Sequence, residues 1–496
     1  MTIVKMIKNL ESELLRRPVH WLILLSFLLN LPAVFFSRGY GMHDDHFGPI
    51  EQPWSIINNP DIWHSRTTPH AHSIFYPLLH FFLFKILYSL GINDPQHVML
   101  IVRFLHSIYS ILTVVFLFKI LELFFERKIA FRVSVLFPLL WFMPFLSVRN
   151  LIEMVCIPPM AIGYYFLLRN KKIVKDLVLA SLFFALAFAF RYQTFIITGT
   201  IFLVLLFKKE FWYGFVFGLA FMFFALIIQG SVDIFAWGYP FASFIEYVSY
   251  NLSHSEDYTS GPFYRYLLLF LGVFTFPLSI YIIYYFVKDV GKHIFIVLPV
   301  IVFFVFHSVF PNKQERFILP IVPFVFAFGL ANFLTYYQNK VIFKTKKGFY
   351  NFIWVMFWII NLPLFFIFSL NYGKKTRCES LYFLSKQTDV KGIFQITGKI
   401  GSFKPPEFYL NKYGTPIFPI PSVDSLGKFT SLPNIPNYAI IYGDEELDSL
   451  KMSVERILKR KLIHIKTVEP SLADWILYKL NPKYNKNQIA NIYKIE

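Results

Sequence analysis

Long apolar segments recur along the chain, and this feature most restricts how the chain can fold. A helix of about 17–25 residues spans the hydrocarbon core of a bilayer. Hydropathy places the apolar segments near residues 19–37, 74–90, 98–122, 132–147, 151–168, 177–190, 193–207, 211–229, 263–287, 293–310, 316–337 and 349–371. We therefore predict an all-α polytopic membrane protein with about 11–12 transmembrane helices.

The composition excludes an ordinary soluble fold. Only 16% of the 496 residues are charged and 56% are hydrophobic, whereas soluble proteins carry about 25% charged residues. The first apolar segment follows Lys5, Lys8, Arg16 and Arg17. It resembles a signal peptide, but no small-residue cleavage site follows it, so we expect a retained signal anchor.

The net charge of +18 raises the alternative of a nucleic-acid partner. The distribution of the basic residues argues against it, because they gather in short loops between apolar segments, as in 169-RNKKIVK-175 and 340-KVIFKTKK-347. Basic loops of this kind stay on the cytoplasmic side, beside anionic lipid headgroups. We expect the lipid bilayer as a partner and no nucleic acid.

The same loops predict the orientation of the chain. The loops placed on the cytoplasmic side are 123–132, 169–176, 208–210, 288–292 and 339–348. Loop 38–75, the long loop 231–262 and everything after residue 372 then lie on the opposite side. One conflict remains around 74–90 and 98–122, since only one crossing is needed there. Either one of these segments is re-entrant or interfacial, or one loop is assigned to the wrong side.

The texture of the sequence changes after residue 371. Short β-like runs, KGIFQITGK, YAIIYGD, LIHIKTV and DWILYKL, alternate with Pro/Gly loops and a helical stretch at 444–460. We predict a transmembrane domain over 1–371 and a small extramembrane α/β domain over 372–496. The tail holds neither a GxGxxG fingerprint nor a Walker lysine loop. Cys156 and Cys378 are the only cysteines, which excludes a Cys-based zinc site.

Loop 38–75 is the first candidate for chemistry, because it holds adjacent aspartates, Asp44 and Asp45, then Glu51 and five of the thirteen histidines. A carboxylate there could act as a general base. The plain alternative is a solvated acidic pair that caps a surface helix. A further alternative is a divalent metal held by His43-Asp44-Asp45-His46. Trp54, Ile56, Ile57, Ile62 and Trp63 predict surface helices in this loop.

Four further polar clusters fall on the same predicted side of the membrane. They are Arg149, Asn150 and Glu153; Arg191 and Gln193; Asp233, Asn251 and Asp257; and Asn312, Lys313, Glu315 and Arg316. A single arginine at the end of an apolar helix is usually a snorkelling anchor. Ionisable groups there are costly unless they are paired or face water, so five clusters on one side favour a shared polar cavity.

Such a cavity suits attack by a hydroxyl on an electrophile whose leaving group is a phosphate. A carboxylate takes the proton, and Lys and Arg stabilise the charge on the departing phosphate. Because the sequence has no nucleotide-binding motif, we expect the activated donor to arrive in the lipid phase.

The order of these motifs resembles that of the Alg- and GPI-type mannosyltransferases, a family of the GT-C glycosyltransferases. The family's first luminal loop reads roughly H-P-D-E, with a further Glu seven residues after the Asp. Glu51 lies seven residues after Asp44, which places Asp44 on the family's catalytic Asp and Asp45 on its Glu. The alternative register aligns His43 with the family's His and makes Asp45 the catalytic residue, but it breaks the spacing to Glu51.

Four further stretches carry the resemblance. The family's R-S-x-x-x-P resembles 72-HSIFYP-77, with His72 in place of Arg, and its second-loop motif resembles 149-RNLIE-153. Its Arg at a helix start resembles 191-RYQ-193. Residues 233–251 followed by 261-GPFYRY-266 resemble its long luminal loop, and 312-NKQERFILP-320 resembles its H-K-E-x-R-F…P.

The resemblance implies a membrane mannosyltransferase that uses a polyprenyl-phosphate sugar donor and a glycan or glycolipid acceptor, with inversion, on the non-cytoplasmic face. It implies Asp44 and Asp45 as catalytic residues. The implied substrate-binding residues are Glu51, His72, Arg149, Glu153, Arg191, Gln193, Lys313 and Arg316. No cofactor is implied. The membrane is either a bacterial plasma membrane or the endoplasmic reticulum. The alternative functions are a lipid-linked oligosaccharide flippase and a glycan ligase acting between lipid carriers.

Overall fold

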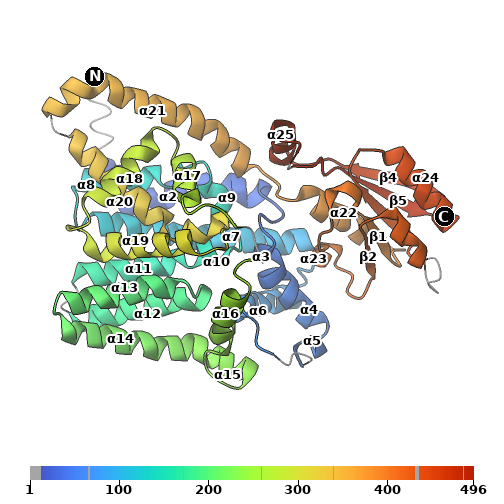
Figure 1. The fold of residues 1–496 in the computed structure, drawn as a ribbon, viewed down its shortest axis with the longest axis horizontal. Helices are drawn as coiled ribbons and strands as arrows, with labels where there is room; N and C mark the ends of the chain where they lie inside the picture. The colour runs from blue at the N-terminus through green and yellow to red at the C-terminus, as the bar shows by residue number, and fades with distance from the viewer. Residues whose placement is uncertain are drawn as a thin grey trace. The chain divides into compact units, whose positions relative to one another are not determined.

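The computed structural model describes residues 13–64, 68–170, 173–257, 260–338, 340–429, 435–483 and 485–496. The described chain divides into two compact units (Figure 1). The first unit contains residues 1–32, 66–78 and 103–369, and the second contains residues 33–65, 79–102 and 370–496. We describe each unit by itself.

The described residues of the first unit form helices joined by turns and short loops. Its helices are α2 (Pro18–Phe36), α7 (Pro95–Leu121), α8 (Arg127–Leu136), α9 (Met143–Ser147), α10 (Ile152–Val155), α11 (Ile157–Arg169), α12 (Val174–Phe190), α13 (Thr194–Phe207), α14 (Phe211–Ala225), η2 (Leu226–Gly230), α15 (Ser231–Trp237), α16 (Ala242–Ser253), α17 (Arg265–Val273), α18 (Leu278–Lys288), α19 (Ile294–Val309), η3 (Glu315–Ile321), α20 (Val322–Tyr337) and α21 (Lys340–Ser369). Both α2 and α7 reach into the second unit at one end.

The apolar segments fold as predicted, into helices of very different lengths. Among the described residues, six helical stretches are long and apolar enough to cross a membrane, or seven if the bent pair α17 and α18 is one span. The segments 132–147 and 263–287 are each broken, the second by a bend of 118° between α17 and α18. The predicted all-α multi-pass membrane fold with a small C-terminal sheet is confirmed, but among the described residues six or seven stretches, rather than the predicted 11–12, are long and apolar enough to span a membrane, because several predicted segments form shorter or broken helices.

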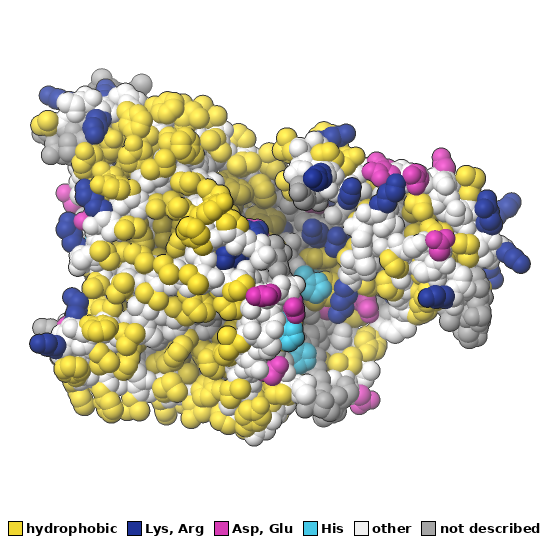
Figure 2. Space-filling model, in the orientation of Figure 1, with side chains coloured by type: hydrophobic (Ala, Val, Ile, Leu, Met, Phe, Trp, Pro, Cys, Tyr) yellow, Lys and Arg dark blue, Asp and Glu magenta, His cyan; other side chains and the backbone are white. Residues whose placement is uncertain are grey.

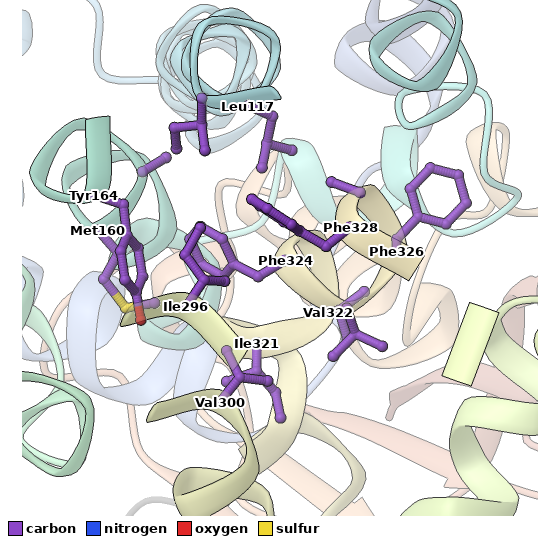
Figure 3. Close-up of a cluster of buried hydrophobic side chains, with 14 of the residues drawn as sticks. Leu117, Met160, Tyr164, Ile296, Val300, Ile321, Val322, Phe324, Phe326 and Phe328 are labelled. Atoms are coloured by element: carbon purple, nitrogen blue, oxygen red, sulfur yellow. The ribbon is translucent and has the colours of Figure 1, made fainter. Parts of the chain in front are cut away.

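The core of the first unit lies around α20. In the span Glu315–Tyr337, 89% of the most apolar window is buried, against 22% in Phe211–Trp237. Phe324, Phe326 and Phe328 of α20 pack among side chains of neighbouring helices (Figure 3). A Cβ atom on Gly329 would lie 2.2 Å from the carbonyl oxygen of Ile282. Only glycine therefore lets α20 and α18 approach so closely.

The surface of the first unit matches a lipid-facing protein. Hydrophobic side chains cover most of its visible face, and Lys and Arg side chains gather at its left-hand end (Figure 2). Phe207, Phe235 and Val309 are more than 70% exposed. Large apolar side chains are stable in such positions when lipid, rather than water, surrounds them.

The second unit contains an α/β sheet. Its helical elements after residue 370 are α22 (Lys375–Ser385), η4 (Gly398–Ile400), α23 (Glu407–Leu410), η5 (Val423–Phe429), α24 (Leu447–Leu458) and α25 (Leu472–Leu480). Its strands are β1 (Ile393–Ile396), β2 (Ile417–Ile420), β3 (Tyr438–Tyr442), β4 (Leu462–Val468) and β5 (Ala490–Ile495). Among the described residues these strands form one sheet in the order β2-β1-β3-β5-β4.

Both faces of the sheet are covered. The pairs β1–β2 and β1–β3 are parallel, whereas β5 runs antiparallel to β3 and β4. One face packs on α22 and α23 through Ile393, Ile440 and Phe408. The other face packs on η5 and α24 through Ile396, Ile441 and Val454. The fully buried β1 and β3 are the continuous apolar runs that the sequence predicts.

The start of the first predicted loop belongs to this second unit. It forms α3 (Asp44–His46), η1 (Phe47–Glu51), α4 (Gln52–Asn58) and α5 (Asp61–His64), so the prediction of helices in this loop is confirmed. The backbone N–H of Gly373 donates to the carbonyl oxygen of Arg38 at 3.0 Å. The hydroxyl of Ser37 donates to the carbonyl oxygen of Asn371 at 3.0 Å. These bonds join the end of α2 to the segment that follows α21.

Residues 79–102, where the predicted orientation was in conflict, also belong to the second unit. The helix α6 (Phe75–Ser89) has only 15 residues and ends in the second unit, where the first turns of α7 begin. Asp94, between the two helices, accepts from Lys386 Nζ at 2.6 Å and from the Tyr382 hydroxyl at 2.9 Å. Of the two helices, α7 is long and apolar enough to cross a membrane, whereas α6 is a shorter apolar helix.

Two features of the tail differ from the prediction. The run DWILYKL is not a strand but lies within α25, where Ser471 accepts a hydrogen bond from the backbone N–H of Asp474 and caps the helix. The strands β2 and β5 were not predicted. The predicted strands at 393–396, 438–442 and 462–468 and the helix α24 are confirmed.

Candidate functional site

A buried ion pair lies where α12 ends. Arg191 directly follows the last residue of α12, Phe190, and its backbone is extended. It therefore lies in the break between α12 and α13. Its Nη1 donates to Glu153 Oε1, and the two side chains are 2% and 1% exposed. Glu153 lies on the short helix α10. The ion pair therefore connects α10 with the break between α12 and α13.

A second guanidinium shares the same carboxylate. Arg316 Nε lies 3.8 Å from Glu153 Oε1 and donates to Gln314 Oε1 at 2.8 Å. Two positive charges thus face one negative charge in a buried place. Arg191 Nε and Nη2 and Glu153 Oε2 are buried without a hydrogen-bond partner among the described residues. Buried charged groups are costly unless they are hydrogen-bonded, so this cluster is suited to an added anion.

Tyr247 of α16 brings other predicted residues to this cluster. Gln193 Nε2 donates to the Tyr247 hydroxyl, and the His72 ring lies 6.4 Å from the Tyr247 ring. Burial raises the pKa of Tyr247 to about 12, and Arg191, Glu153 and Arg316 are near enough to shift it. Five of the predicted substrate-binding residues therefore share one neighbourhood, namely His72, Glu153, Arg191, Gln193 and Arg316.

A buried polar network fixes α16 in this position. Both carboxylate oxygens of Asp233 accept from Ser243, one from its hydroxyl and one from its backbone N–H at 3.2 Å. Gln229 Nε2 donates to the Ser243 hydroxyl at 3.3 Å, and the Ser73 hydroxyl donates to Gln229 Oε1 at 2.7 Å. The network ties the segment of His72 to the helix of Tyr247. Tyr247, Gln229 and Ser73 were not predicted, although each lies in or beside a motif that was.

Lys313 and Arg149 have other surroundings. Lys313 Nζ donates to the carbonyl oxygen of Phe310 at 2.6 Å, and burial, with Arg265 nearby, lowers the pKa of Lys313. The Arg149 guanidinium lies 4.2 Å from the centroid of the Phe145 ring and lines a small cavity with His106 and Tyr109. Both side chains are buried, and their predicted contacts with substrate stay predictions.

The two aspartates of the first loop, in the second unit, differ in exposure. Asp45 is 2% exposed, and its Oδ2 accepts from the backbone N–H of Gly41 at 2.9 Å. Its carboxylate lies near enough to Lys374 and Tyr40 to shift their pKa values. Asp44 begins α3 and is only half-buried. Asp44 is therefore the more accessible carboxylate.

Glu51 is held by protein groups. Its Oε1 lies 3.0 Å from His46 Nε2, and both of its carboxylate oxygens accept from the backbone N–H of Phe408, at 2.9 and 3.1 Å. Burial, and then Glu51, raise the pKa of Glu407. These contacts anchor η1 to α23. A role of Glu51 in binding substrate stays a prediction.

The histidines beside the aspartates have aromatic neighbours. His43 stacks on Phe47 at 4.2 Å between ring centroids, and His46 stacks on Tyr40 at 4.8 Å and on Tyr409 at 5.4 Å. Within the described ranges, no group of three or more His, Cys, Asp or Glu side chains is arranged to hold a metal ion. The role of a metal stays untested.

One protein-family pattern matches the helical part of the chain. The pattern of the Alg9-like mannosyltransferase family matches residues 57–397, about two thirds of the chain. The match begins after Asp44, Asp45 and Glu51 and ends before most of the C-terminal sheet. No curated protein sequence matches the chain.

Solved structures share its fold. ArnT from Cupriavidus metallidurans bound to undecaprenyl phosphate is 12% identical, with 96% of this chain and 97% of that chain covered and a TM-score of 0.60. The apo form of the same protein is also 12% identical, with the same coverage and a TM-score of 0.63. An oligosaccharyltransferase from Archaeoglobus fulgidus, tethered with an acceptor peptide, is 11% identical, with 92% of this chain and 74% of that chain covered and a TM-score of 0.52.

These identities establish the fold, which is that of the GT-C glycosyltransferases, and not the substrates. The resemblance drawn from the sequence motifs is confirmed by the family match, which is independent of the fold comparison. The chain therefore belongs to the Alg9-like mannosyltransferase family of membrane glycosyltransferases.

Proposed function

We propose that the protein transfers a hexose, with mannose as the first choice, from a polyprenyl-phosphate donor to a hydroxyl of a glycan or glycolipid acceptor on the non-cytoplasmic face. The observation that carries the proposal is the buried surplus of guanidinium charge around Glu153, with two nitrogens of Arg191 unpaired within the described chain. A phosphate group would supply the missing anion and accept from those nitrogens.

The reaction is a single displacement. The acceptor oxygen attacks C1 of the sugar, the bond from C1 to the phosphate oxygen breaks, and the hydroxyl proton passes to Asp44. The polyprenyl phosphate leaves with the bonding electron pair. One displacement inverts C1, so one base suffices and no covalent sugar–enzyme intermediate forms.

The residue roles follow the same chemistry. Arg191, Arg316 and Lys313 bind the donor phosphate and stabilise the charge that grows on it. Glu153 and Gln193 orient the Arg191 guanidinium and the Tyr247 hydroxyl, with which they are hydrogen-bonded. Asp45 accepts from Gly41 and so fixes the turn that presents Asp44. A carboxylate base and the positively charged Arg and Lys side chains suffice for these steps, so we propose that no metal is required.

The test combines purified protein in lipid vesicles with radiolabelled polyprenyl-phosphate mannose and candidate glycolipid acceptors. We expect new labelled acceptor from the wild type, with or without EDTA, and none from Asp44→Asn. The control is Asp61→Asn, because Asp61 is an exposed carboxylate on α5 of the same loop. Full activity of Asp44→Asn in folded protein would sink the assignment of the base.

The same assay separates the alternative functions. Movement of label across the bilayer without a new glycosidic bond indicates a flippase. Transfer of a preassembled glycan between lipid carriers, with no transfer of single sugars, indicates a ligase. Either result overturns the proposed hexosyl transfer.

A further inference from the structure

The C-terminal sheet has the topology that places ligands at one defined edge. The strands β2, β1 and β3 are parallel, with β1 in the middle. The connection from β1 to β2 runs through α23 on one face, and that from β2 to β3 runs through η5 on the other. In open α/β sheets the crevice beyond the carboxyl ends of such diverging strands is where ligands bind.

This edge is hollow in the protein. A crevice of about 310 Å³ is lined mainly by residues that follow β1, β2 and β3. Gly398 and Gly443, at the ends of β1 and β3, both have positive φ, so the chain turns sharply away and leaves the crevice open. The volume lies within the range of small-molecule sites, about 300–1,000 Å³.

The crevice combines an apolar floor with a polar rim of nearly balanced charge. Ile400, Val423 and Leu450 line it, together with Lys399, Lys486, Asp444, Glu445 and Glu446. Lys399 Nζ pairs with Glu446 at 3.1 Å and with Glu445 at 3.7 Å. Two lysines against three carboxylates leave a charge of −1, which repels phosphate.

One amide points to a neutral hydrogen-bonding ligand. Asn487 Nδ2 donates to Asp444 Oδ2 at 2.7 Å, while Asn487 Oδ1 is buried without a partner within the described chain. An amide oxygen beside a carboxylate accepts hydrogen bonds from neighbouring hydroxyls, and apolar side chains pack against the C–H face of a sugar ring. The family match ends at residue 397, before every residue that lines the crevice.

We propose that this crevice binds a short, uncharged glycan segment of the acceptor, at a site separate from the residues that carry the transfer. The inference rests on the proposed function for the identity of the sugar. The bound segment raises the local concentration of acceptor, so the site acts on the KM for acceptor and not on the bond-breaking step.

The test measures binding of α-linked mannobiose to full-length protein by saturation-transfer NMR. Ser422 is exposed at the crevice mouth, so Ser422→Trp fills the space, and the double variant Asp444→Ala, Asn487→Ala removes the hydrogen-bonding pair. We expect at least a tenfold loss of affinity in both. Lys461→Trp, at an exposed position outside the lining, is the matched control and keeps wild-type affinity.

The outcomes are separable from those of the transfer assay. Arg191→Gln is expected to lose transfer and keep mannobiose binding. Saturable binding that Ser422→Trp weakens supports the crevice even if the wild type fails to transfer mannose. Binding that is absent, that is equal in Ser422→Trp and wild type, or that inorganic phosphate displaces overturns the proposal.

Discussion

Neighbouring residues of the same type have different surroundings in this protein, and these surroundings suggest separate roles. Asp45 is buried against the Gly41 N–H, whereas Asp44, one position earlier, keeps part of its surface exposed. A base must reach the hydroxyl from which it takes the proton. Exposure therefore favours Asp44 on grounds that are independent of its spacing to Glu51.

The Arg191–Glu153 pair provides a prediction about activity. Arg191→Gln should lower kcat/KM for the lipid donor about 100-fold or more, because removing one preorganised contact to a developing charge costs about 2.7–4 kcal/mol. Arg127→Gln, which breaks an exposed pair with Glu122, should change kcat/KM less than twofold. The measurement is initial-rate kinetics with varied donor.

A double variant separates catalysis from folding. Arg191→Gln leaves the Glu153 carboxylate buried, which by itself destabilises a protein. Arg191→Gln combined with Glu153→Gln removes both charges of the pair and leaves only Arg316, so its size-exclusion profile should be closer to that of the wild type than the profile of Arg191→Gln, while it remains inactive. Recovery of activity in the double variant would contradict the proposed phosphate contact.

Whole helices depend on single close contacts. The approach of α18 to α20 at Gly329 predicts that Gly329→Ala destabilises the protein by about 1–3 kcal/mol or more, since the added methyl overlaps a backbone carbonyl. Gly199→Ala in α13 is the matched control, because a Cβ atom there has no neighbour within 4 Å. Thermal unfolding in one detergent compares the two. A stable Gly329→Ala would show that the helices separate at little cost.

The hairpin of α6 and α7 predicts a pH dependence. Burial acts to raise the pKa of Asp94, but hydrogen bonds from Lys386 and Tyr382 outweigh it and the net pKa is lowered. A lowered folded-state pKa stabilises the fold above the unfolded value, about 3.9, and this contribution is lost as the pH falls through the folded value. Asp94→Asn should cost about 0.5–1 kcal/mol at pH 7 and nothing below both pKa values.

The measurement is the difference in unfolding free energy between wild type and Asp94→Asn across pH 2–7. A difference that stays constant down to the lowest pH would mean that the asparagine acts through packing rather than through charge. Asp289→Asn is the comparison, since Asp289 pairs at 3.3 Å with the exposed Lys292 within one turn.

The elements that the sequence predicts best are those defined by composition alone. Twenty apolar residues in a row have few alternatives in lipid, and the β-branched and aromatic runs of β1 and β3, which are bounded by Pro and Gly residues, favour strands. The prediction of a strand at DWILYKL was wrong because its residues also fit a helical period. The cap at Ser471 favours the helix over the strand. Glu153 and Arg191 were predictable from their types. The central position of Tyr247 in the site was not predictable, because nothing in the sequence distinguishes it from the other 28 of the 29 tyrosines. Only the position of α16 in the fold shows it.

Across the whole chain, connectivity constrains which segments share a side of the membrane. The ends of α2 and α21 and the start of α7 all lead into the second unit. Since the bonds of Ser37 and Arg38 with residues 371 and 373 lie within that unit, we expect the first loop and the C-terminal domain to share one side of the membrane. The lysines between α13 and α14 lie in a predicted cytoplasmic loop.

This arrangement predicts the result of cysteine labelling in intact cells. Lys391→Cys, exposed beside β1, should react with a membrane-impermeant maleimide, and Lys208→Cys should react only after the membrane is opened. The native Cys156 and Cys378 are both buried, so their background is low. Reaction of Lys208→Cys in intact cells would contradict the proposed orientation.

The hydrogen bonds between Glu51 and Phe408 also affect the order in which parts of the chain can fold during synthesis. Their partners are 357 residues apart, so at about 5–20 residues per second the ribosome reaches Phe408 roughly 20–70 s after Glu51. During that interval the segment carrying Asp44 has emerged without the partner that anchors it. The first loop therefore reaches its final contacts only after residue 408 has been made, so a truncation before Phe408 should leave a loop near the beginning of the chain without its anchor.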